Sequence, residues 1–169
     1  MTTVDVAPVD VRDPAVLALV DALTAELATG GYTEDETFGY TPEQLAASAV
    51  HLLGASMDGT LVGIAGVELD DEGGGELKRF YVAPAHRGSG VADALLEALV
   101  AHARERGATV LRLETGDAQA AALRFYARHG FRRVPRFGPY VDSATSVCLE
   151  RRLDDATPPG VEREGPAPA

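Results

Sequence analysis

The sequence predicts an α/β fold in which a mixed sheet carries helices on both faces. Three observations lead to this class. Two apolar runs flank an Asp-Gly pair in the middle of the chain, a long amphipathic helix pattern follows a short strand pattern, and helix and strand patterns alternate again afterwards. The 169 residues and the 46% apolar content fit one globular domain.

The first third of the chain predicts one strand and two helices. Val4–Val9 alternates weakly as an opening strand. Asp13-Pro14 is a cap and first-turn signal for a helix that Gly30-Gly31 ends. A polar loop with aromatic residues follows over Tyr32–Tyr40, and Thr41–Gln44 has the pattern of a capping box at the start of a second helix.

The middle of the chain predicts three strands. His51–Met57 and Thr60–Leu69 flank Asp58-Gly59, which is a strong signal for a two-residue hairpin turn. Asp70–Gly75 has the composition of a flexible loop, and we expect the third strand over Glu76–Val82.

The last part of the chain alternates helices and strands. Gly90–Arg106 is the clearest helix, with one continuous apolar face. A short strand over 110–114, a helix over Ala118–His129 and a final strand over Ser143–Leu153 follow. The expected order is therefore β-α-α-β-β-β-α-β-α-β.

The composition bounds the domain organisation and the partners. We expect one domain over 1–153 and a disordered tail over 154–169, because the tail is rich in Pro, Gly and charge. The net charge of −11 argues against nucleic acid as the main partner. Residues 1–77 hold 15 acidic residues and one basic residue, whereas residues 78–169 hold 11 acidic and 14 basic residues. This asymmetry either serves solubility or indicates that the two halves meet ligands of opposite charge.

Targeting and redox signals are weak or absent in the sequence. The N-terminal residues lack a basic region followed by an apolar core, and no apolar run is long enough to span a bilayer. Cys148 is the single cysteine, so no internal disulfide forms, and we interpret it as a small buried apolar residue. A cytoplasmic protein without membrane contact is the default expectation. The four histidines show no metal-ligand spacing, and we expect no metal.

A glycine-containing loop carries the strongest chemical signal. His86–Ala92 lies between a predicted strand and the amphipathic helix, where free amides and the helix dipole attract anions. Arg87 adds a positive charge to this phosphate cradle. A P-loop is excluded because GK[ST] is absent, and Asp93 occupies the place of the third glycine in a dinucleotide fingerprint. Purely structural glycines remain the alternative.

The residues around this loop resemble the GNAT acetyltransferases. Arg87–Ala92 matches the pyrophosphate pattern R/Q-x-x-G-x-G/A of that family, and Leu77–Pro84 resembles the strand before it. Leu111–Gly116 resembles the next strand, and Ala121–Phe131 resembles the family's second helix, which bears a tyrosine. The resemblance covers about residues 50–152. It implies a mostly antiparallel central sheet, splayed between the fourth and fifth strands, and acetyl-CoA as co-substrate.

The resemblance also implies cofactor-binding residues in three groups. They are the backbone groups of Phe80, Tyr81 and Val82 for the pantetheine arm, the amides of Arg87, Gly88, Ser89, Gly90, Val91 and Ala92 for the pyrophosphate, and Gln119 near the pantetheine.

The implied mechanism is direct transfer of the acetyl group to a neutral amine. The resemblance assigns Tyr126 as the proton donor to the departing thiolate, with a packed aromatic as the alternative. It indicates Glu76 as the base, with a water relay or a solvated strand end as alternatives. Phe38, Tyr40 and Tyr140 occupy places where this family builds its acceptor pocket.

Three functions fit these features. The first is an N-acetyltransferase acting on a small cationic amine, which the acidic first half favours. The second is a protein acetyltransferase that modifies a lysine or an N-terminus. The third is a non-catalytic acyl-CoA sensor. The oligomeric state stays open, with a homodimer among the options.

Overall fold

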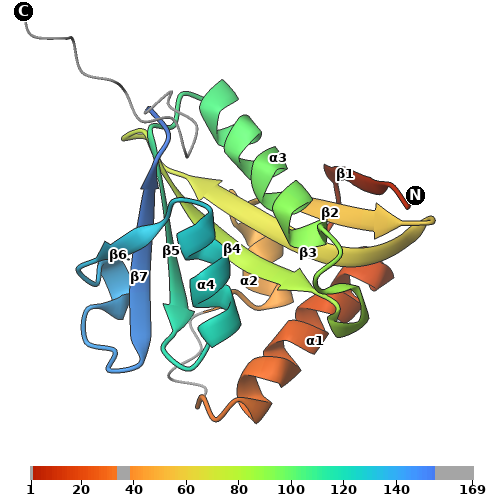
Figure 1. Cartoon of the computed structure of the whole chain (residues 1–169), viewed down its shortest axis with the longest axis horizontal. Coiled ribbons are helices and arrows are strands. Elements are labelled where there is room, and N and C mark those ends of the chain that lie inside the picture. The colour runs from red at the N-terminus through yellow and green to blue at the C-terminus, as the bar shows by residue number, and fades with distance from the viewer. Residues whose placement is uncertain (1, 34–38, 155–169) are drawn as a thin grey trace, which may run out of the picture.

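A seven-stranded sheet organises the computed structural model, which describes residues 2–33 and 39–154 (Figure 1). The strand order across the sheet is β1-β2-β3-β4-β5-β7-β6. The strands are β1 (Val4–Pro8), β2 (His51–Met57), β3 (Thr60–Leu69), β4 (Gly74–Val82), β5 (Val110–Gly116), β6 (Arg132–Val134) and β7 (Ser146–Arg152). The helices are α1 (Pro14–Thr29), α2 (Pro42–Ala47), α3 (Val91–Glu105) and α4 (Ala120–Arg128), with short 3-10 turns η2 (Pro84–His86) and η3 (Gly138–Tyr140).

The sheet opens between β4 and β5. All other neighbouring strands are antiparallel, whereas β4 and β5 are parallel and share only three residue pairs, from Gly74–Val110 to Glu76–Arg112. Beyond Glu76 the two strands diverge (Figure 1). The predicted mixed, mostly antiparallel sheet with a splay between its fourth and fifth strands is thereby confirmed.

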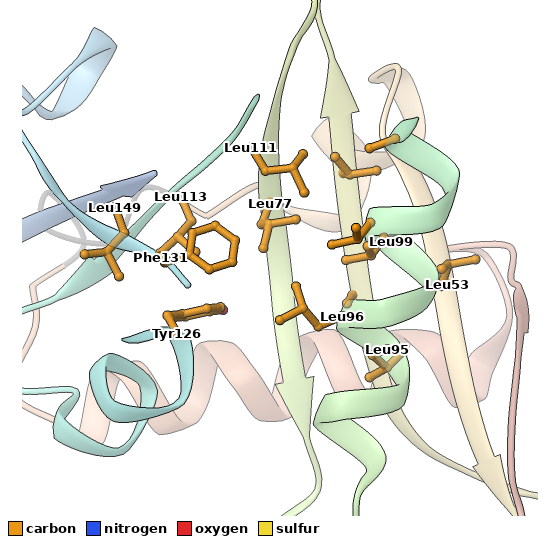
Figure 2. Close-up of a cluster of buried hydrophobic side chains, with 14 of the residues drawn as sticks. Leu53, Leu77, Leu95, Leu96, Leu99, Leu111, Leu113, Tyr126, Phe131 and Leu149 are labelled. Carbon is orange, nitrogen blue, oxygen red and sulfur yellow. The ribbon is translucent and has the colours of Figure 1, made fainter. Parts of the chain in front are cut away.

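Helices cover both faces of the sheet, as predicted. α3 and α4 lie on one face, and α1 and α2 lie on the other (Figure 1). Figure 2 shows Leu95, Leu96 and Leu99 of α3 packed toward the strands, and these three side chains are almost completely buried. Burying three leucines contributes several kcal/mol, at roughly 1.5–3 kcal/mol each. This packing fixes where α3 begins, which is the end that carries the glycine loop.

Local signals set several elements as expected. Asp58 and Gly59 both have positive φ, of 51° and 79°, which is the backbone of the predicted two-residue hairpin turn. Asp13 caps α1 by accepting a hydrogen bond from the amide of Ala15. The capping box at Thr41 and Gln44 is present at α2.

The glycine-rich segment before β4 differs from the prediction. We expected a loop over Asp70–Gly75, but β4 already begins at Gly74 and pairs there with β5. A Cβ on Gly75 would lie 2.7 Å from Leu69 Cδ2 and 3.0 Å from Leu111 Cδ2, so a larger residue here would have to displace these leucine side chains. The remaining turn is ordered by Asp70, whose carboxylate accepts hydrogen bonds from the amides of Glu72 and Gly74.

Three further differences concern the C-terminal part of the chain. β6 is an unpredicted strand of three residues at the sheet edge, where it pairs with β7. β5 extends to Gly116, and β7 begins at Ser146 rather than Ser143. Residues 155–169 of the expected tail lie outside the described part of the chain. Among the described helices, none combines the length and apolar character that crossing a bilayer requires.

Candidate active site

A pocket lies where β4 and β5 part. Its cavity volume is about 170 Å³, and β4, β5, α1, α4 and η3 all contribute to its wall. Five of the residues that the sequence singles out line this one pocket: Glu76, Phe80, Gln119, Tyr126 and Tyr140. The splay therefore brings together side chains that are up to 64 positions apart in the sequence.

The glycine loop between η2 and α3 presents free backbone donors. Gly88 and Gly90 have φ values of 79° and 87°, in the left-handed region that glycine tolerates. The amides of residues 88–93 have no acceptor within the described chain, and they lie at the positive end of the α3 dipole. The Ser89 hydroxyl donates to the carbonyl of His86, which closes the turn. This arrangement can hold a diphosphate by backbone contacts.

The side chain of Arg87 is already engaged. Its Nη1 and Nη2 each donate to the Glu26 carboxylate of α1 over 2.8 Å, and its Nε donates to the carbonyl of Val82. The hydrogen bond with Glu26 raises the pKa of Arg87. The amide of Arg87 donates to the Pro84 carbonyl. The positive charge expected at the mouth of the loop is therefore paired, and the free amides start at Gly88.

Asp93, in the first turn of α3, faces away from the cradle. Its carboxylate lies 2.6 Å from His129 Nε2 and accepts from Arg128 of α4. Burial alone would raise the pKa of Asp93, but the contacts with His129 and Arg128 outweigh burial and lower it. The cradle thus keeps its positive potential although an acidic residue stands beside it.

The free edge of β4 runs alongside the pocket. Arg79 has a φ of 54°, and the β3–β4 register shifts here, so that β4 contains a bulge. Phe80 faces α4, with its ring centroid 6.1 Å from that of Tyr126. The side chain of Tyr81 is buried against α1 and α2, which leaves only its backbone for a ligand. Pairing of this edge with a pantetheine arm stays a prediction.

Tyr126 of α4 combines packing with an open hydroxyl. Its side chain is 7% exposed and makes edge contacts with Phe80, Phe125 and Phe131. Figure 2 shows its ring beneath Phe131, on the side of the core next to β4. Within the described chain its hydroxyl has no hydrogen-bond partner, yet none of the fully buried side-chain polar atoms there lacks one. The hydroxyl therefore opens into the pocket. Burial raises the pKa of Tyr126, so the group keeps its proton at neutral pH.

Glu76 belongs to a small polar network rather than to a solvated strand end. The hydroxyl of Tyr140 donates to Glu76 Oε1 over 2.5 Å, and Lys78 Nζ lies 3.1 Å from the same oxygen. Lys78 is the single lysine of the chain, and its side chain is 10% exposed. Burial, followed by the contact with Glu76, raises the pKa of Tyr140.

Glu114 of β5 is a pocket residue that the sequence analysis missed. It lines the same wall as Glu76, and the Ser146 hydroxyl donates to its carboxylate over 2.8 Å. Burial raises the pKa of Glu114, and the Glu76 carboxylate adds to this effect, against the hydrogen bond from Ser146. The available signal is the alternation of Leu111 and Leu113 with charged residues, which places Glu114 on the same face of the strand as Arg112.

The remaining acceptor-side predictions have different outcomes. Tyr140 lines the pocket, and Phe38 lies outside the described residues. The hydroxyl of Tyr40 donates to Glu68 over 2.7 Å, which raises the pKa of Tyr40 to about 12. The Lys78 ammonium lies 4.7 Å from the centroid of the Tyr40 ring. Tyr40 thus contacts Lys78 and Glu68 but is not one of the residues that line the pocket.

Cysteine and the potential metal ligands bear on the expectations for Cys148 and for a metal site. Cys148 is 1% exposed within β7, in agreement with the prediction of a small buried apolar residue. Across residues 2–33 and 39–154, no three His, Cys, Asp or Glu side chains gather as they would around a metal ion.

Comparison with known proteins identifies the family. The model of the Acetyltransferase (GNAT) family matches residues 19–131. An "IAA acetyltransferase" from Azospirillum brasilense is 34% identical over 154 residues, which are 90% of this chain and 100% of that protein. The crystal structure of a candidate acyl-CoA N-acyltransferase from Klebsiella pneumoniae is 36% identical, with a TM-score of 0.74 over 90% of this chain and 98% of that one.

A more distant structure supports the fold. The PaiA N-acetyltransferase from Thermoplasma acidophilum, solved in complex with coenzyme A, is 18% identical, with a TM-score of 0.73 over 89% of this chain and 99% of that one. From the family match, these relatives and the splayed sheet, we conclude that the chain belongs to the GNAT acetyltransferase family, a family of acyltransferases.

Proposed function

We propose that the protein is an N-acetyltransferase that moves an acetyl group directly from acetyl-CoA to a small amine that arrives as an ammonium ion. One observation carries this proposal. One pocket in the splay is lined by Tyr126 and by two carboxylates, Glu76 and Glu114, and the amide cradle follows the end of β4, the strand that forms part of the pocket wall.

The donor side is argued from the backbone. Acetyl-CoA supplies an activated thioester. The amides of Gly88, Ser89, Gly90, Val91 and Ala92 would receive its pyrophosphate, and the free edge of β4 at Phe80–Val82 would pair with the pantetheine arm like an added strand. Gln119, the N-terminal cap of α4, lines the pocket beside this edge. The coenzyme A complex of the Thermoplasma family member supports this choice of donor.

The acceptor side must remove a proton. An ammonium ion is not a nucleophile, so the amine needs a base before it attacks the thioester carbonyl. Glu76 is the base that the family resemblance indicates. Glu114 is a second candidate, because a carboxyl with a raised pKa is a better match for a proton transfer near neutral pH.

The departing thiolate needs a proton in return. Tyr126 is suited to supply it, since its hydroxyl is protonated at neutral pH and opens into the pocket. Holding the amine in line with the thioester would supply much of the remaining acceleration.

Two carboxylates of the pocket support an acceptor that carries an ammonium group. Glu76 and Glu114 line the pocket together with two basic side chains, Lys78, whose ammonium is shared with Glu76, and Arg79. The name of the Azospirillum relative supports acetyl transfer as the reaction.

A thiol-release assay with acetyl-CoA across an amine library tests the proposal, together with a CoA titration. We expect CoA binding and acetylation of small amines. CoA binding without acetylation of any amine or protein would instead support the sensor, and acetylation of lysines or N-termini of proteins alone would support a protein acetyltransferase.

A further inference from the structure

Arg79 is a buried cation whose charge has no counter-ion in the described chain. It lies at the bulge of β4 and is 9% exposed. Its Nε donates to the carbonyl of Tyr40 over 2.8 Å, and its Nη2 donates to the Thr24 hydroxyl over 3.0 Å. Both acceptors are neutral. Within residues 2–33 and 39–154, no carboxylate lies within ion-pair distance of this guanidinium.

The third nitrogen of Arg79 opens into the pocket. Nη1 donates to no partner among the described residues, although every fully buried side-chain nitrogen there has one. It must therefore retain access to solvent space. Arg79 lines the pocket, and so does Gly39, where the absence of a side chain leaves room for the guanidinium.

A buried guanidinium without a counter-ion is unfavourable. Burial lowers the pKa of Arg79, which is the sign of this cost. An anionic group of a ligand would relieve it, and the planar fork of arginine suits a carboxylate. The pyrophosphate cradle cannot serve Arg79, because the cradle starts beyond the end of β4 whereas Arg79 lies within the strand.

We propose that the acceptor carries a carboxylate as well as its amine, and that Arg79 Nη1 binds this carboxylate while Glu76 and Glu114 receive the ammonium. This inference rests on the proposed function and narrows its acceptor to amino acids and similar amino carboxylates. The same pocket wall includes Leu23 and Leu27, which offer an apolar surface for the rest of such a molecule.

Acetyl transfer to matched acceptors tests this assignment. Leucine carries the carboxylate, leucinamide replaces it with a neutral amide, and isoamylamine lacks it. Matched trios built in the same way on an acidic and on a basic amino acid extend the set. We expect kcat/KM for the amino acid to exceed that for its amide and its decarboxylated amine about ten- to hundredfold. The amine of an amide loses its proton more easily, so a preference for the amino acid would not reflect intrinsic reactivity.

Variants separate ligand binding from a merely structural role. Arg79→Gln should raise KM for the amino acid about ten- to hundredfold, with little change for the amide, and Arg79→Lys should restore part of the preference. Gly39→Ala should act in the same direction, because a Cβ there would lie 2.5 Å from Nη1 and displace the guanidinium while keeping its charge. Arg104→Gln on α3 is the matched control.

Two outcomes would overturn the inference. One is equal or better acetylation of the amides and amines. The other is an Arg79→Gln variant in which kcat/KM falls equally for all three members of a trio, since that marks Arg79 as a support for the Tyr40 segment. If no amine is acetylated at all, the proposed function fails, and titration of amino acids into the CoA-saturated protein decides. Binding that Arg79→Gln abolishes keeps the inference, and no binding ends it.

Discussion

The two sides of the candidate site are built in different ways. The glycine loop at 86–92, which we propose as the cofactor side, offers backbone amides, two left-handed glycines and the start of one helix, all within a few consecutive residues. The proposed acceptor side is built from side chains of β4, β5, α1 and η3. The loop is therefore a local device that changes in one residue can disable, whereas the acceptor side depends on the tertiary arrangement of several elements.

Gly90→Glu should have the largest effect and fall on the loop. The substitution forces a side chain onto a φ of 87° and places a negative charge among the free amides. We expect CoA affinity to fall by about a hundredfold or more, measured by calorimetric titration. Gly107→Glu is the control, because Gly107 has a φ of 82° at the other end of the same helix and is equally open. Unchanged affinity in the Gly90 variant would refute the pyrophosphate assignment.

Glu114→Gln and Glu76→Gln compare two carboxylates within the acceptor side. The pKa of Glu114 is raised, so its basic form is lost at a higher pH than that of an ordinary glutamate as the pH falls. If Glu114 is the base, kcat decreases toward acidic pH in the wild type. Glu114→Gln should lower kcat about a hundredfold and remove this acidic limb. Glu76→Gln should retain the limb. The reverse pattern would identify Glu76 as the base, and an unchanged profile in both would favour a water relay.

Tyr126→Phe tests the group that lies between the two sides. It keeps the ring contacts with Phe80 and Phe131 and removes only the hydroxyl. We expect kcat to fall about tenfold or more, with CoA affinity unchanged. Thermal unfolding of the variant provides the control for packing. A wild-type kcat would leave Tyr126 with its packing role alone.

Thr41→Ala should have the smallest effect. It removes the N-terminal cap of α2, the helix that follows the Tyr40 segment. Loss of the capping box at α2 should lower the free energy of unfolding by about 1 kcal/mol, measured by urea denaturation. Glu43→Gln in the same first turn serves as the control, with an expected change of a few tenths of a kcal/mol. CoA affinity should not respond to either variant, because α2 contributes no residue to the loop. A change in affinity would mean that the two sides are not independent.

The contrast between local and tertiary determinants also explains which elements could be predicted from the sequence. The β2–β3 hairpin, the caps of α1 and α2, and the glycine loop before α3 depend on neighbouring residues, and all of these elements are found where the sequence predicts them. β6 was missed because its three residues show no periodicity and gain their structure by pairing with β7.

The missed features of the site are also tertiary. The pairing of Arg87 with Glu26 and the raised pKa of Glu114 arise between residues from different elements. The early start of β4 comes with the pairing of Gly74 and Gly75 with β5, which is remote in sequence. In the sequence Glu114 is one of two charged residues that alternate with Leu111 and Leu113, and only the fold brings it close to Glu76.

Lys78 gives the molecule an unusual profile toward amine-directed reagents. The other 14 basic side chains are arginines, which stay protonated and are poor nucleophiles at neutral pH. A lysine-selective ester therefore has one side chain to modify in this chain, and that side chain lies on the wall of the pocket. Because the terminal α-amine reacts as well, peptide mass mapping of the labelled protein would report the modification of Lys78 separately, with Tyr40, Glu76 and Tyr140 as its immediate surroundings.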